Sequence, residues 1–154
     1  MRALPAVLVM LGVVALACSS SSPEEAPLVV TDMALGSLKL SDGALVLDQE
    51  RARLPRVAGT SGDLAHTFGI CFQATGGARP GALAIHVFPP AKITETELSR
   101  TGEGVRVPVE LERGVDHLCQ EMFFDATDPV GPWRFELRDG VRTLRAWDIE
   151  VYEP

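Results

Sequence analysis

Alternation of apolar and polar residues with a period of two sets the narrowest limit on what this chain can fold into. In Trp133–Arg138 every second residue is large and apolar and every other one is charged. Thr67–Ala74 repeats the pattern, with Phe68, Ile70 and Phe72 on one face. Successive side chains of a β-strand point to opposite faces, so these stretches predict strands with one face in a core. No window of comparable length has a helical period with caps.

Turn signals separate the alternating stretches and predict how they connect. Asp42-Gly43 and Asp139-Gly140 are typical two-residue hairpin turns. In the last stretch Leu144 and Ala146 share one face and Trp147, Ile149 and Val151 share the other, which predicts a β-bulge near Arg145. Seven to nine short strands at intervals of about 8–12 residues are typical of a sandwich. We therefore expect an all-β fold, a single antiparallel immunoglobulin-like β-sandwich.

The amino terminus predicts export from the cytoplasm. Arg2 precedes an uncharged apolar run that ends at Ala17, as in a signal peptide over residues 1–17. A helix needs about 20 residues to span a bilayer, and this run is shorter. The next charges are the acidic Glu24 and Glu25, so no basic stop follows the run. A permanent transmembrane anchor is therefore the weaker interpretation.

The end of this leader, Ala15-Leu16-Ala17-Cys18, resembles the lipobox of bacterial lipoproteins. The resemblance implies cleavage between Ala17 and Cys18 and acylation of Cys18 with fatty acids such as palmitate. It also implies delivery to the cell outer membrane, because Ser19 rather than Asp follows the cysteine. The family prefers Leu three residues before the cysteine, where this chain has Ala15. Ala15-x-Ala17 also satisfies ordinary signal peptidase, so a secreted soluble protein is the alternative.

The three cysteines suggest one disulfide bond and help to set the boundaries of the predicted segments. If Cys18 carries lipid, Cys71 and Cys119 form an even pair in an oxidising compartment, and we predict a disulfide between them. Two separate free thiols are the alternative. We expect residues 18–27 to be the lipidated cysteine with a Ser/Pro tether, and residues 28–154 to be the sandwich.

The charge of the chain limits its partners. The formal net charge is -7, which argues against nucleic acid and against anionic lipid headgroups as ligands. Solubility explains this acidity without any further role. The membrane, reached through the lipid on Cys18, is the expected partner, and a protein or glycan partner stays unspecified.

Three histidines and one polar turn are the candidates for chemistry. Ser61, Asp63 and His66 offer a hydroxyl, a carboxylate and an imidazole close together in sequence. No nucleophile elbow accompanies them, so a polar turn with local hydrogen bonds is the preferred interpretation. The spacing of His66, His86 and His117 fits no zinc signature, and we expect neither a metal nor a cofactor. The alternative is an enzyme or metal-dependent accessory factor that uses Asp63, His66 or His117.

Two tryptophans and one loop are candidates for binding. Trp133 and Trp147 would stack on a sugar ring if exposed, but both alternate in phase with apolar residues, which favours core packing. The polar segment Lys92–Gly104 is a better place for recognition, because binding residues tend to lie on loops held by a rigid scaffold.

Three short motifs resemble an uncharacterised domain family of secreted Gram-negative proteins. The motifs are Thr67-Phe68-Gly69-Ile70, Pro89-Pro90 and Gly131-Pro132-Trp133, and the resemblance covers about Met33 to Val151. It implies a β-sandwich and supplies no catalytic residues. The leading hypothesis is therefore a lipid-anchored, non-catalytic β-sandwich that acts as a binding or structural module.

Overall fold

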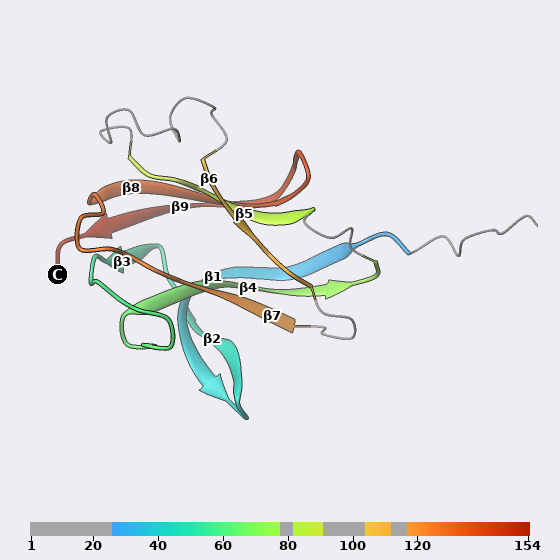
Figure 1. Cartoon of the computed structure of the whole chain (residues 1–154), viewed down its shortest axis with the longest axis horizontal. Coiled ribbons are helices and arrows are strands. Elements are labelled where there is room, and N and C mark those ends of the chain that lie inside the picture. The colour runs from blue at the N-terminus through green and yellow to red at the C-terminus, as the bar shows by residue number, and fades with distance from the viewer. Residues whose placement is uncertain (1–25, 78–81, 91–103, 112–116) are drawn as a thin grey trace, which may run out of the picture.

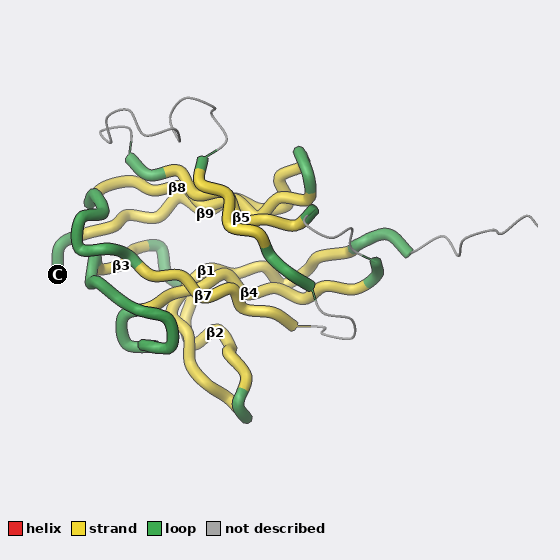
Figure 2. Tube along the Cα trace, in the orientation of Figure 1, coloured by secondary structure: helices red, strands yellow, loops and turns green. Residues whose placement is uncertain are grey.

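The computed structural model of the chain describes residues 26–77, 82–90, 104–111 and 117–154. The predicted signal peptide, Cys18, nearly all of the tether and most of the Lys92–Gly104 segment lie outside these ranges. The described residues form nine β-strands and no helix (Figure 2). None of these residues belongs to a helix that is long and apolar enough to cross a bilayer. The predicted all-β class is confirmed.

The strands form two sheets that pack face to face (Figure 1). The first sheet has four strands, in the order β2 (Ala44–Glu50), β1 (Val29–Ser41), β4 (Thr67–Thr75) and β7 (His117–Phe123). The second sheet has five strands, in the order β3 (Arg53–Pro55), β9 (Arg142–Tyr152), β8 (Gly131–Asp139), β5 (Leu83–Phe88) and β6 (Val105–Pro108). Apart from the short parallel pair β3–β9, the neighbouring strands run antiparallel. The predicted sandwich is confirmed.

The core lies between the sheets and is built from the inward faces that the alternation predicted. Phe72 of β4 is fully buried, and Phe135 and Leu137 of β8, in the second sheet, belong to the same buried cluster. At one end of the core, Phe68 stacks on Phe124 with ring centroids 4.8 Å apart, and the edge of Trp133 approaches Phe124 at 5.4 Å. Each such aromatic pair contributes about 1 kcal/mol beyond the area that it buries. This apolar layer joins the two sheets.

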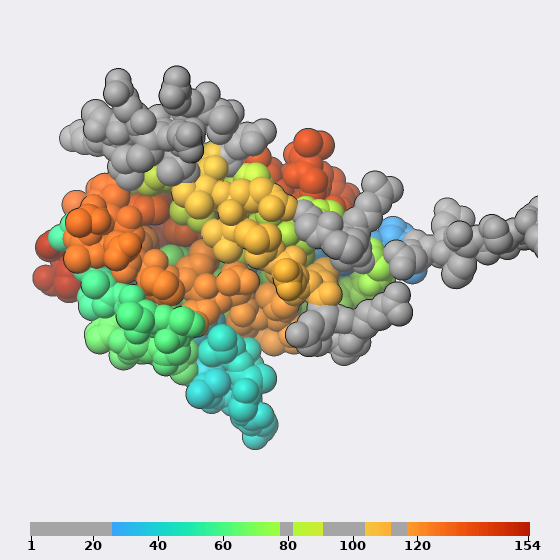
Figure 3. All heavy atoms as spheres, viewed as in Figure 1, coloured from blue at the N-terminus to red at the C-terminus, as the bar shows by residue number. Residues whose placement is uncertain are grey.

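The first predicted hairpin turn is confirmed. Asp42 and Gly43 both have positive φ, of 50° and 80°, which a type I′ turn requires at its two central positions. The turn joins β1 to β2, and the hairpin tip stands away from the body of the molecule (Figures 1 and 3). Leu40 near this tip is 62% exposed, so the end of the hairpin lies outside the core.

The second hairpin turn lies one residue later than predicted. Asp139 pairs with Arg142 as the last rung of the β8–β9 ladder, so the turn residues are Gly140 and Val141 rather than Asp139 and Gly140. Gly140 has a φ of 58°, which suits the first central position of a type II′ turn, where glycine is required. The positive φ of this glycine therefore determines which two residues make the turn.

The predicted β-bulge is confirmed and lies in β9. Leu137 pairs with Arg145 and Arg138 pairs with Thr143, which leaves Leu144 as the extra residue. A bulge reverses which face the following residues occupy. Leu144 at the bulge and Trp147 after it both pack against the core as a result.

Candidate functional site

A disulfide joins two neighbouring strands on the outer face of the first sheet. Cys71 of β4 and Cys119 of β7 lie directly opposite each other, with Cα atoms 4.0 Å apart and their sulfurs bonded. Both residues alternate with core residues such as Phe72, so their side chains point away from the core. The predicted disulfide is confirmed. In antibody domains the conserved disulfide links the two sheets, whereas here it links strands within one sheet.

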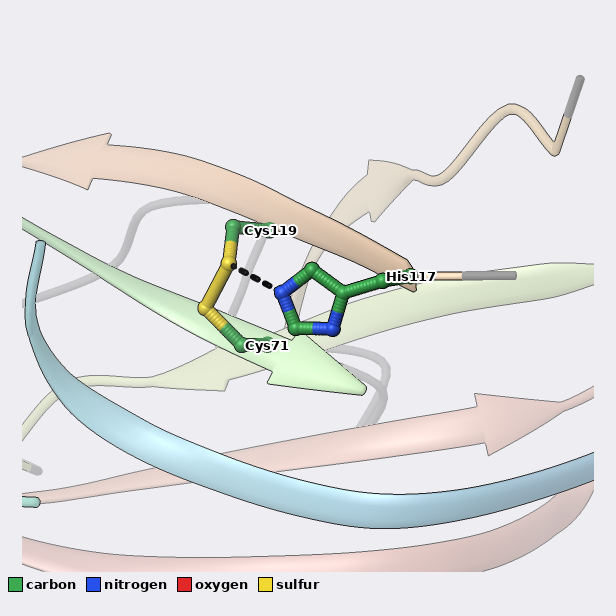
Figure 4. A group of neighbouring side chains, drawn as sticks. All are labelled: Cys71, His117 and Cys119. Carbon is green, nitrogen blue, oxygen red and sulfur yellow. Dashed lines mark hydrogen bonds between the residues drawn. A yellow bond between two sulfur atoms is a disulfide. The ribbon is translucent and has the colours of Figure 1, made fainter. Parts of the chain in front are cut away.

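The imidazole of His117 lies against this disulfide (Figure 4). Its Nε2 is 3.5 Å from Sγ of Cys119, and the ligand atoms of Cys71, His117 and Cys119 all lie within 4.8 Å of one another. His117 and Cys119 are two residues apart on one strand, so they share a face. Our sequence reasoning missed this group, although the His-x-Cys spacing within a strand signals it. These side chains place two sulfurs and one imidazole nitrogen together.

The polar turn at Ser61–His66 forms as predicted. His66 Nδ1 lies 2.7 Å from Asp63 Oδ2, and the backbone N–H of His66 donates to the carbonyl of Asp63. The hydroxyl of Ser61 donates to Glu121 Oε2 at 2.9 Å, so this hydroxyl is held by Glu121 and not by His66. The backbone N–H of Gly62 donates to the other oxygen of Glu121. These bonds hold the turn over the outer face of the first sheet.

The fold does not bring His117 to Asp63 and His66. His66 directly precedes Thr67 at the start of β4, whereas His117 pairs with Gln73 near the end of that strand. Six residues of β-strand span about 20 Å. Asp63 and His66 therefore make one pair, and His117 belongs to the disulfide group.

A cleft of about 240 Å³ opens at the end of the sandwich beside β3. It is lined by three basic side chains, Arg51, Arg53 and His66, together with Ser37, Leu54, Pro55, Val57, Leu64, Ala65, Thr67, Phe68, Phe124 and Tyr152. These residues come from both sheets and from the turn, so tertiary packing creates the cleft. No sequence motif marks it.

The charge inside this cleft is opposite to that of the whole chain. The chain has 21 acidic residues, yet none of the residues that line the cleft is acidic. Arg53 lies over the ring of Tyr152 at 4.8 Å, and within the described ranges neither Arg51 nor Arg53 forms an ion pair. The hydroxyl of Thr67 is buried and has no hydrogen-bond partner among the described residues. The cleft thus offers two guanidinium groups, beside the hydroxyl-bearing residues Ser37 and Tyr152.

On the outer face of the second sheet, charged residues pair with one another. Glu136 is 7% exposed and accepts hydrogen bonds from Arg134 and Arg138, each at 2.7 Å. His86 is also 7% exposed and lies between Arg106 and Glu136 in adjacent strands. His86 therefore lies within this group of charged residues on the outer face of the second sheet.

The two tryptophans differ in burial. Trp133 is in the core and donates its indole N–H to the carbonyl of Pro129 at 2.9 Å, which confirms its predicted packing. Trp147 packs against the core but stays partly exposed, with the guanidinium of Arg145 5.3 Å from its ring centroid. The prediction of core packing therefore holds fully for Trp133 and in part for Trp147.

Comparison with known proteins identifies the architecture. No protein-family model matches the chain, and no curated protein matches it significantly. Among solved structures, it is similar to an immunoglobulin-like protein from Pseudomonas aeruginosa, with a TM-score of 0.53 and 20% sequence identity. The match covers 80% of this chain and 97% of that one. The described part of the chain is therefore an immunoglobulin-like β-sandwich.

Proposed function

We propose that this protein is a lipid-anchored, non-catalytic binding module of the cell envelope. The observation that carries the anchoring is the pairing of Cys71 with Cys119, because it leaves Cys18 as the remaining cysteine of three. Disulfides persist in oxidising compartments, which agrees with export. Cys18 follows Ala15-Leu16-Ala17, where lipid attachment is expected, and Ser19 favours the outer membrane.

Radiolabelled palmitate tests the anchor. The wild-type chain in a Gram-negative host is expected to take up label and to fractionate with the outer membrane, since multiple acyl chains give stable attachment. Cys18→Ala removes the acceptor thiol, and we expect the label to disappear and the protein to become soluble in the periplasm.

The matched control is the double variant Cys71→Ala, Cys119→Ala, which removes two thiols and keeps Cys18. It should be labelled as well as the wild type. Label that persists in Cys18→Ala, or that never appears in the wild type, contradicts the anchor and favours a secreted soluble protein.

For the ligand, the cleft beside β3 supports a small molecule with carboxylate or phosphate groups. Arg51 and Arg53 line it without a carboxylate partner among the described residues, and a planar guanidinium binds either group through paired hydrogen bonds. Tyr152 adds an aromatic wall.

Nuclear magnetic resonance titration with citrate, inorganic phosphate and acetate tests this site. Citrate and phosphate are expected to shift the side-chain Nε resonances of Arg51 and Arg53 and the amide of Thr67, with weaker binding as NaCl is added. Arg51→Gln and Arg53→Gln should each weaken citrate binding at least about tenfold, since one charge-assisted hydrogen bond contributes about 1.5 kcal/mol or more.

Arg142→Gln is the matched control, because Arg142 lies at the other end of β9 from Tyr152 and pairs with Asp139. It should leave citrate binding unchanged. Shifts spread over many surface arginines, or equal binding by Arg51→Gln, contradict an anion site in this cleft.

A further inference from the structure

We propose that reduction of the Cys71–Cys119 disulfide creates a binding site for one thiophilic closed-shell cation, Zn²⁺ or Cu(I). The ligands are Sγ of Cys71, Sγ of Cys119 and Nε2 of His117. This site lies on the outer face of the first sheet and does not depend on the proposed anchor or on the anion cleft.

The ligand types match such a cation. Thiolate and imidazole are the ligands that Zn²⁺ and Cu(I) prefer, and two cysteines with one histidine leave a fourth position open on Zn²⁺. Cys71 comes from β4 and both other ligands come from β7, so two adjacent rigid strands supply all three. Figure 4 shows the imidazole turned toward the sulfurs rather than away from them.

One of the three ligand–ligand distances already suits a tetrahedral centre, and the other two require Sγ of Cys71 to move. Bond lengths of about 2.3 Å for Zn–S and about 2.0 Å for Zn–N put ligand sulfur and nitrogen about 3.6 Å apart. Nε2 of His117 and Sγ of Cys119 are already 3.5 Å apart. The two sulfurs must separate to about 3.8 Å, which rotation about χ1 of the opposed cysteines allows. Sγ of Cys71 also has to come closer to Nε2 of His117, since the three ligand atoms now lie within 4.8 Å of one another, so the movement falls mainly on Cys71.

The disulfide is accessible from one side. β7 is the last strand of the first sheet, so none of the strands that the structure describes pairs with its outer edge. Cys71 is 2% exposed, whereas Cys119 is half-buried and His117 is exposed. An incoming thiolate therefore attacks Sγ of Cys119, and Cys71 is the leaving group.

The chemistry balances with a dithiol as reductant. One thiolate of the dithiol bonds to Cys119 and releases Cys71; the second thiolate then displaces Cys119, and the reductant leaves as its own disulfide. Two electrons and two protons pass to the protein, which gives two thiols. Zn²⁺ binding releases both protons, because the ligands are thiolates, and the neutral imidazole completes the set.

The test uses the full chain with Cys18→Ser, so that Cys71 and Cys119 are the remaining thiols. After reduction with a phosphine, the protein is titrated with Zn²⁺, with Co²⁺ as a spectroscopic substitute, and with Cu(I) against a chromophoric chelator. The reduced chain is expected to bind one ion and to show thiolate-to-Co²⁺ charge-transfer absorption. The oxidised chain is expected to bind none at this site. Circular dichroism reports whether the reduced chain keeps its strands.

Two histidine variants distinguish Zn²⁺ binding at the proposed site from Zn²⁺ binding elsewhere on the surface. His117→Ala removes one ligand from an exposed position and should weaken Zn²⁺ binding at least tenfold, while the matched control His66→Ala should not change it. Equal Zn²⁺ binding by His117→Ala overturns the assignment. Loss of strand structure on reduction, or a folded reduced chain that shows neither thiolate-to-Co²⁺ charge transfer nor Cu(I) binding, also overturns it. Binding of Cu(I) without Zn²⁺, lost in His117→Ala, supports the site and restricts it to the softer ion.

Discussion

At the scale of single residues, Glu136 is a buried carboxylate among the described residues, and its charge affects the stability of the fold. Its carboxylate accepts hydrogen bonds from Arg134, Arg138 and Thr143. Burial raises the pKa of Glu136, but these hydrogen bonds outweigh that effect and hold its pKa below the ordinary value. The ionised form is therefore the one that the folded state prefers.

We predict that Glu136→Gln lowers the free energy of unfolding at pH 7 by about 1.5 kcal/mol, because hydrogen bonds to a charged group are lost. A depressed carboxyl pKa stabilises the fold above the unfolded pKa of about 4.3, and the gain disappears as pH falls through the folded value. The difference between variant and wild type should therefore shrink below about pH 4. Urea unfolding at a series of pH values measures it.

The matched control for this prediction is Asp148→Asn, which removes another partner of Arg134 but from a side chain that is 77% exposed. Exposed ion pairs contribute about 0.5 kcal/mol or less, so its effect should be smaller. A Glu136→Gln variant as stable as the wild type at pH 7 contradicts the account.

From the sequence, the side of the sheet to which a side chain points could be predicted better than how deeply that side chain is buried. Alternation correctly placed Phe72 and Phe135 inward and Glu136 outward. It did not indicate that Glu136 is nearly as buried as a core residue, because its cover comes from flanking arginines and from His86 on a strand 50 residues earlier. Neighbours of that kind depend on strand order, which a local pattern does not contain.

At the scale of elements, the cross-strand disulfide fixes β4 against β7. It closes a sequence separation of 48 residues, which corresponds to about 4 kcal/mol in the chain-entropy treatment. We predict that the double variant Cys71→Ala, Cys119→Ala still folds, because neither side chain belongs to the apolar cluster between the sheets. Its unfolding free energy should fall by up to about 4 kcal/mol. Urea unfolding measures the change.

The single variant Cys71→Ala, compared with the wild type after reduction, controls for the loss of packing at this buried position. The two should unfold at similar urea concentrations. If the double variant is as stable as the wild type, the disulfide does not stabilise the fold. If the double variant has no strand structure, the prediction that the chain folds without the two cysteines is wrong.

Pairing between distant strands limited what could be predicted of the elements. The strand containing Cys119 and the strand containing Cys71 were each recognisable, but their adjacency and register were not. For that reason His117 was considered as a metal ligand only by its spacing from other histidines. The predicted turn, Asp139-Gly140, was one residue too early for a different reason. Gly140 can occupy the second position of one turn type or the first position of another, and the local sequence does not decide between the two types.

At the scale of the whole molecule, the sandwich was predictable and its cleft was not. Turn spacing and alternation indicated an immunoglobulin-like fold, as the solved structure from Pseudomonas aeruginosa bears out. The split into four and five strands, and the meeting of Arg51 and Arg53 with Tyr152, arise from β3 pairing in parallel with the end of β9. A charged cleft formed in this way leaves no mark in the local sequence.

The most direct test of an exported, acylated sandwich is the intact mass of the chain purified from membranes, measured after alkylation with and without prior reduction. The account predicts a mature chain that begins at Cys18, carries acyl groups there, and gains two alkyl groups only after reduction, on Cys71 and Cys119. A chain that retains residues 1–17, or one whose three cysteines are alkylated without reduction, would contradict it.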